Sequence, residues 1–344
     1  MRRLASVLLA AVAHAAGAAE EPLQTQVPAA AVVADEPTPA DPPVTVFETM
    51  VVTGAQPGPG LWKVSKGEHV LWILGTLTPL PKKMEWISRD VEATIAQSQE
   101  VVMGPSATLE VGVFSGLALL PSLVGARNNP DDAQLSEVVP AEVYARWQVQ
   151  KAKYLGNDKG VEKRRPIFAA DELYDAAIER PGLSGANVTE PVVVKAAKKH
   201  GVPVTRPLLK LKFEKPRQAV KEFKKSALDD LECFERTIAR VETDLDTMKE
   251  RANAWATGDV QLLRELPYSD QNRICEDAVL RANISQERGL GDLKPRLGQL
   301  WLEAVEKALD KNDSTFSMLS LSHMLGDDGL LQRLRAKGYE VEEP

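Results

Sequence analysis

The chain has 344 residues, of which 44% are hydrophobic and 26% charged, and its formal net charge is -7 at pH 7. A chain of this length and apolar content can bury a sizeable core, so a wholly disordered protein is excluded. The acidic balance argues against a nucleic-acid-binding protein, which would need a basic face.

The N-terminus has the pattern of a secretory signal peptide. Met1-Arg2-Arg3 supplies a basic region, residues 4–13 a short apolar region, and Ala16-Gly17-Ala18 a small-residue cleavage site. This apolar region and all later apolar runs are shorter than the roughly 18 residues of a transmembrane helix. We expect residues 1–18 to be removed and the mature protein to be periplasmic or secreted. Their loss takes away two arginines and no acid, so the net charge changes from -7 to -9.

Residues 19–59 are predicted to be a linker rich in proline, alanine and acidic residues. Between Glu20 and Gly60 there are eight prolines and no lysine or arginine, a composition that buries too little apolar surface to fold. Residues 44–53 interrupt it with strand-like composition, and their second half resembles the TonB-box segments of outer-membrane receptors. This segment could add an edge strand to the domain or pair with the sheet edge of a partner.

Two paired strands, over residues 61–64 and 70–75, are predicted to open the folded domain. The second ends at Gly75, Thr76 and Thr78. An apolar run that stops at a polar turn delivers side chains to the carboxyl edge of an α/β sheet, where ligands usually bind. Gly75 and Thr76 are therefore candidate substrate-binding residues, and Thr78 is a candidate catalytic residue.

The middle of the chain predicts a mainly helical region. A helix over residues 84–97 and a strand over 100–103 are followed by helices over 141–154, 168–179 and 190–200 and a short strand over 203–206. Residues 217–255 have apolar positions every three or four residues, which indicates one long helix or a hairpin. Further helices are expected over 260–266, 270–282 and 293–309. We expect an α/β fold over 60–344, with a central mixed sheet flanked by helices and a helical cap over about 215–310.

The two cysteines, Cys233 and Cys275, both lie in this helical region. A metal site would need more thiolates or histidines at close spacing. Two cysteines in an exported protein usually pair, so we predict a disulfide bond.

A second apolar run, over residues 316–321, leads to a polar turn near the C-terminus. It carries His323, a candidate catalytic residue and metal ligand, and Ser320 and Gly326 as candidate substrate-binding residues. A lone histidine here could also be a hydrogen-bonded residue in the wall of the core. Asp327 could join His323 on a metal ion, although its alternative role is to cap a helix over 329–337.

His69 and His200 are expected to be structural. His69 begins its strand, at the end opposite Thr78. His200 lies in the last turn of a helix that Gly201 ends, where a basic residue suits the carbonyl end of the helix.

These motifs resemble the TraB/GumN family, which includes Tiki-type and PrgY-like proteins and is distantly related to erythromycin-esterase and ChaN-like domains. The matching stretches are Leu61-Trp62-Lys63-Val64, Leu74-Gly75-Thr76, Ala254-Trp255-Ala256-Thr257-Gly258-Asp259, and His323 with Gly326, Gly329 and Leu330. Their combined order, from about Gly60 to the C-terminus, is more specific than any one of them. The resemblance implies a metal-dependent hydrolytic site that includes two histidines.

The departures from the family pattern fall on that site. Thr78 stands where the family has a histidine, Gly104 where it has a glutamate, and Ser320 where it has a glycine. A hydrolytic metal centre needs about three protein ligands and an open position for water. The sequence therefore predicts a divergent member with a degenerate metalloprotease site.

Three functions remain open at this point. The first is a binding domain without cofactor, for a peptide, an envelope protein or a small molecule. The second is an active peptidase or esterase in which His323 and Asp327 hold Mn²⁺, Co²⁺ or Zn²⁺. The third is an envelope interaction protein that uses residues 44–53.

Overall fold

The structure is a computed structural model that describes residues 50, 54–110, 121, 123–212, 215–226, 228–266, 271–282, 285–286, 288–325 and 329–344. The leader, the linker up to residue 53 apart from Met50, and the predicted site residues Gly326 and Asp327 lie outside these ranges. The chain divides into two units, and everything described here belongs to the second, Thr49–Pro344. The boundaries proposed above for leader, linker and cap stay predictions.

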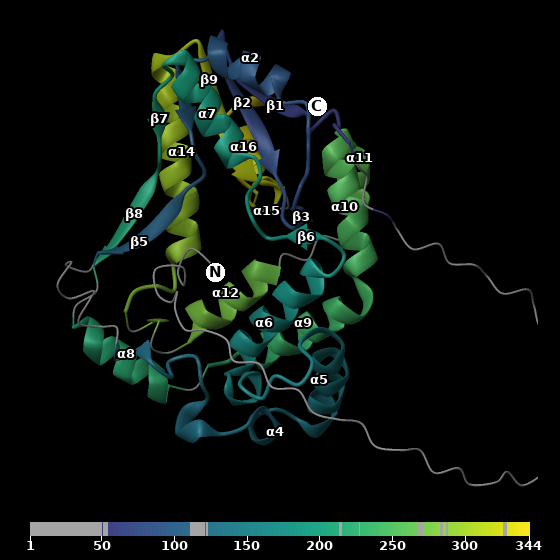
Figure 1. Cartoon of the computed structure of the whole chain (residues 1–344). Coiled ribbons are helices and arrows are strands. Elements are labelled where there is room, and N and C mark those ends of the chain that lie inside the picture. The colour runs from purple at the N-terminus through teal and green to yellow at the C-terminus, as the bar shows by residue number, and fades with distance from the viewer. Residues whose placement is uncertain are drawn as a thin grey trace, which may run out of the picture. The chain divides into compact units, whose positions relative to one another are not determined.

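A six-stranded mixed sheet forms the centre of this unit and confirms the predicted α/β class. Its strand order is β10-β1-β2-β9-β4-β7 (Figure 1). The strands are β1 (Leu61–Lys66), β2 (His69–Thr76), β4 (Glu100–Val102), β7 (Val204–Thr205), β9 (Ser314–Ser320) and β10 (Glu340–Glu342). β1 is antiparallel to β2 and β10, whereas β2, β9, β4 and β7 run parallel to one another. The two apolar runs that lead to polar turns, one near each end of the folded domain, are thus the neighbouring central strands β2 and β9.

Helices cover both faces of the sheet, as the apolar sequences of its parallel strands require. On β2, Leu71 and Ile73 pack in one core with α14 (Leu293–Lys311), while Leu74 packs in a second core with α2 (Arg89–Gln97) and α7 (Glu190–His200). This alternation follows from the two-residue period of a strand. Side chains at the carboxyl end of β2 are therefore placed between two helical layers.

Two smaller sheets extend the strands. β5 (Ser106–Glu110) follows β4 and pairs in parallel with β8 (Leu208–Lys212), which follows β7; β3 (Leu80–Pro81) pairs with β6 (Leu183–Ser184). The sequence analysis missed this β5–β8 ribbon. Neither Ser-Ala-Thr-Leu-Glu in β5 nor Leu-Leu-Lys-Leu-Lys in β8 is long enough to distinguish a strand from a helix, so only the pairing of these two distant segments defines the ribbon.

A second group of helices packs around α9 (Leu231–Thr243). Its neighbours are α5 (Ala141–Tyr154), α6 (Pro166–Glu179), α10 (Leu245–Thr257) and α12 (Gln271–Arg281). The region predicted as one long helix or a hairpin is three helices, α8 (Pro216–Lys225), α9 and α10. Further helices among the described residues include α4 (Leu135–Val138), α11 (Val260–Glu265), α15 (Leu321–Met324) and α16 (Leu330–Ala336). Within the described ranges, none of the helices has the length and apolar content to cross a bilayer.

The helix predicted over residues 84–97 begins later, at Arg89. The backbone of Gln56 forms hydrogen bonds with the backbone of Glu85 and Ile87, within the stretch where the helix was predicted to begin. The amide of Gln56 donates to the carbonyl of Glu85 at 3.0 Å, and the amide of Ile87 donates to the carbonyl of Gln56 at 2.7 Å. Because these groups bond to a segment far away in sequence, they do not close a helical turn.

Trp255 on α10 joins the helical group to the sheet. Its indole nitrogen donates to the carbonyl of Gly75 on β2 at 2.9 Å, and its side chain is fully buried. A Cβ atom at Gly75 would lie 2.7 Å from the ring of Trp62 and 2.6 Å from Leu321, so no larger residue fits there without displacing them. The hydrogen bond therefore fixes α10 against the carboxyl end of β2.

The predicted disulfide bond is confirmed. Cys233 on α9 and Cys275 on α12 are joined, which links two helices of the group around α9. The remainder of the described chain has no free cysteine.

We expect Cys233→Ser with Cys275→Ser to lower the free energy of unfolding by about 4 kcal/mol, because the bond closes a separation of 42 residues in the unfolded chain. Urea unfolding followed by circular dichroism measures this change. Reduction of the unaltered protein should produce a similar shift, and an unchanged unfolding midpoint in both samples would contradict the prediction.

We expect Trp255→Phe to destabilise the fold more than Trp301→Phe does, by about 1–3 kcal/mol, because it leaves the buried carbonyl of Gly75 unpaired. Trp301 is a matched control, since it is also fully buried and its indole nitrogen has no partner among the described residues. Urea unfolding of both variants measures the difference. Equal destabilisation would show that the hydrogen bond contributes nothing.

Candidate functional site

The carboxyl ends of β2 and β9 bring three of the predicted site residues together. Thr76 and Ser320 are directly paired across the two parallel strands, and Gly75 pairs with Leu319. Thr76 and Ser320 are both partly exposed. This carboxyl edge is where open α/β sheets usually bind ligands, so Gly75 and Thr76 from the first apolar run and Ser320 from the second share one location.

Thr78 follows the end of β2 by two residues. It is partly exposed and precedes a cis peptide bond to Pro79. The adjacent Leu77 and Leu80 are buried and hold this turn in place. A catalytic role for Thr78 stays a prediction, because a hydroxyl needs a nearby base to act as a nucleophile.

Gly104 lies two residues beyond the end of β4, on the other side of β9 from Thr78. A Cβ atom there would be 3.4 Å from the carbonyl oxygen of Met318 and 3.9 Å from Leu319, which is ordinary van der Waals contact. Its φ angle is not in the positive range that favours glycine. Neither packing nor backbone conformation therefore requires glycine at the position where the family pattern has glutamate.

His323 lies on the single turn α15 that follows β9, and its side chain is exposed. Its Nδ1 atom is 2.8 Å from Oγ of Ser320, which in turn is 3.0 Å from Oγ of Ser322. The sequence analysis named Ser320 and His323 separately and missed Ser322. The spacing of three residues could have linked Ser320 to His323, because residues three apart share one face of a helical turn, but the contact between Ser320 and Ser322 has no such signal in the sequence. Two hydroxyls and an imidazole thus form one polar cluster at the carboxyl edge.

The described residues do not assemble a metal centre. Among them, no three His, Cys, Asp or Glu side chains lie close enough together to hold a metal ion. His69 is at the amino end of β2, with Nδ1 2.8 Å from the carbonyl oxygen of Asn312, and His200 ends α7 before the left-handed Gly201. Both histidines therefore lie away from the carboxyl edge, as expected. The pairing of His323 with Asp327 stays a prediction.

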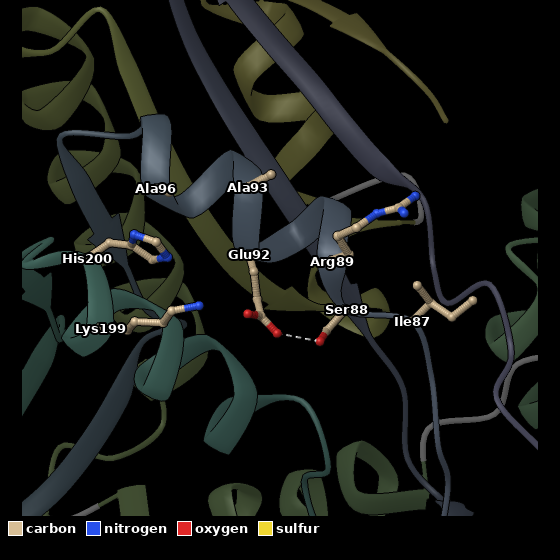
Figure 2. A pocket seen from close by; sticks show the side chains of 8 residues that line it. All are labelled: Ile87, Ser88, Arg89, Glu92, Ala93, Ala96, Lys199 and His200. Carbon is tan, nitrogen blue, oxygen red and sulfur yellow. Dashed lines mark hydrogen bonds between the residues drawn. The ribbon is translucent and has the colours of Figure 1, made fainter.

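A separate surface pocket lies on the outer side of α2 and α7. Figure 2 shows Ser88, Arg89 and Glu92 from one end of α2, and Lys199 and His200 from the end of α7, around it. Oγ of Ser88 donates to Glu92 at 2.6 Å. None of the predicted site residues lines this pocket. Its open, mixed-charge lining is distinct from the polar cluster at the carboxyl edge.

Comparison with known proteins bears on the whole of this unit. The family model described as the TraB/PrgY/gumN family matches residues 60–343, from the residue before β1 to the residue after β10. No curated protein and no solved structure matches the chain. Because the family match covers most of the sequence and spans every strand of the central sheet, the chain belongs to the TraB/PrgY/gumN family.

Proposed function

We propose that this chain is an exported binding domain in which the metal-hydrolase site implied by the family resemblance is incomplete. The observation that carries the proposal is the pair Thr78 and Gly104, which stand where the family pattern has a histidine and a glutamate. Two of about three ligands of a hydrolytic metal site are thereby missing. The ligand class is a peptide, an envelope protein or a small molecule.

The chemistry of the carboxyl edge supports binding. Thr76, Ser320 and Ser322 offer hydroxyls that can both donate and accept hydrogen bonds, and His323 adds an imidazole. Ser320 already contacts both Ser322 and His323, so these side chains are held ready for a polar ligand. A ligand rich in amide or hydroxyl groups, such as a peptide, matches such a lining without a charged partner.

Export is supported by two independent features of the chain. Residues 1–18 have the three regions of a signal peptide. The disulfide between Cys233 and Cys275 is a bond that persists in oxidising compartments such as the periplasm. We therefore place the mature protein in the periplasm or outside the cell.

Calorimetry with Zn²⁺, Mn²⁺ and Co²⁺ on the metal-stripped chain starting at Ala19 tests the loss of the metal site. We expect no stoichiometric binding by the unaltered chain. We expect Thr78→His with Gly104→Glu to gain binding, because it restores two family residues at strand ends beside β9 and position 104 accommodates a Cβ atom. The gain should disappear when His323→Ala is added.

Thr78→Ala with Gly104→Ala is the matched control, since it changes the same positions without adding ligands. Tight one-to-one binding by the unaltered chain that His323→Ala abolishes would overturn the proposal. It would favour an active metal-dependent hydrolase that uses His323 and a relocated carboxylate such as Asp327.

The intact mass of protein isolated from the envelope of a bacterial host tests export. We expect a chain that begins at Ala19, and we expect Ala16→Gln with Ala18→Gln to prevent cleavage by removing the small residues that the peptidase requires. A mass that retains Met1, in the cytosol and with both thiols open to alkylation, would contradict export.

A further inference from the structure

Ser320 and His323 form a hydroxyl–imidazole pair at the carboxyl end of β9. Oγ of Ser320 lies 2.8 Å from Nδ1 of His323. This separation falls within the range of about 2.6–3.2 Å over which a base can take the proton of a nucleophile. Ser320 is partly exposed and His323 is exposed, so a substrate in solution can reach both groups.

Capping of α15 does not account for the serine. Ser320 occupies the N-cap position, where a serine side chain usually accepts a hydrogen bond from the helix backbone. It makes no such bond here. Its hydroxyl contacts the imidazole of His323 and, at 3.0 Å, the hydroxyl of Ser322. The residue that replaces the family's glycine at position 320 therefore brings a hydroxyl to a histidine.

The partner of Ser320 differs in its chemistry from the partners of other serines on and near the sheet. Ser317, also on β9, donates to the carbonyl of Val102 at 2.7 Å, and Ser98 donates to the carbonyl of Thr94 at 2.8 Å. A backbone carbonyl does not take up a proton near neutral pH, whereas a neutral imidazole does. In the tautomer that carries its proton on Nε2, the Nδ1 atom of His323 accepts the hydrogen bond from Ser320.

We propose that Ser320 is the nucleophile and His323 its base in a metal-independent hydrolysis of carboxylic esters. Oγ of Ser320 attacks the ester carbonyl carbon while its proton passes to Nδ1 of His323. The bond to the leaving oxygen then breaks, and the imidazolium gives its proton to the leaving alcohol. Water next attacks the acyl-serine and gives a proton to His323. The bond from the acyl carbon to Oγ breaks, the carboxylic acid leaves, and the proton returns to Ser320.

The surroundings of the pair favour esters over amides. The hydroxyl of Ser322, 3.0 Å from Oγ of Ser320, can donate to the oxyanion that forms beside the attacking atom. Because the cluster is open to water, its hydrogen bonds stabilise charge less than those of a closed site do. An alcohol leaves more readily than an amine, so an ester needs less of this stabilisation.

This inference goes beyond the proposed binding function, because it adds a covalent step at the carboxyl edge. It does not depend on the metal site, since neither Thr78 nor Gly104 takes part. The two proposals can therefore fail separately.

Reaction of the chain starting at Ala19 with a fluorophosphonate, which phosphonylates activated serine hydroxyls, tests the nucleophile. We expect one adduct, placed on Ser320 by peptide mass spectrometry and absent from Ser320→Ala. His323→Gln keeps a side chain that can hydrogen-bond but cannot take up a proton. We expect it to slow labelling by about a hundredfold or more, and we expect EDTA to leave the rate unchanged.

Ser88→Ala is the matched control. Ser88 also precedes a helix without capping it and is partly exposed, but its Oγ donates to the carboxylate of Glu92 at 2.6 Å. We expect Ser88→Ala to be labelled on Ser320 at the rate of the unaltered protein. Circular dichroism checks that each variant is folded.

Release of p-nitrophenol from p-nitrophenyl acetate tests turnover. We expect more than one equivalent per chain, and a rate close to that of buffer for Ser320→Ala. The proposal is wrong if Ser320 is not labelled, if His323→Gln is labelled as fast as the unaltered chain, or if release stops at one equivalent. Loss of labelling in EDTA would also overturn it, whereas metal binding in calorimetry without such a loss would overturn the proposed function alone.

Discussion

The hydrogen bond from the indole of Trp255 to the carbonyl of Gly75 is the contact on which the candidate site depends. It joins α10 to the carboxyl end of β2. The absence of a side chain at Gly75 leaves room for the side chains of Trp62 and Leu321 to pack against this glycine. The segment before β1 joins this arrangement, since the amide of Gly58 donates to the carbonyl of Ala256 at 2.8 Å. The ends of β2 and β9 are thereby held in one relative position.

This scaffold places residues at strand ends without deciding what chemistry they perform. Thr76 and Ser320 are neighbours because β2 and β9 pair in parallel, whatever side chains they carry. Gly104 occupies a position that would accept a Cβ atom, so packing does not account for the missing glutamate. A fold can host different functions in this way, because function depends on the residue types at the site. The proposed change from metal hydrolysis to binding needs no change in the sheet.

The sequence by itself determined the α/β class, the central strands, most helices, the disulfide partners and the family. Buried parallel strands are continuous apolar runs and amphipathic helices repeat every three or four residues, so both leave a local pattern. Only the tertiary structure decided that α2 begins at Arg89, that β5 pairs with β8, and that Ser320 contacts both Ser322 and His323. The first two depend on backbone pairing between distant segments, and the third on side-chain orientation at a strand end. Neither leaves a periodic signal in the chain, because the partners are specified by the folded arrangement rather than by their neighbours in sequence.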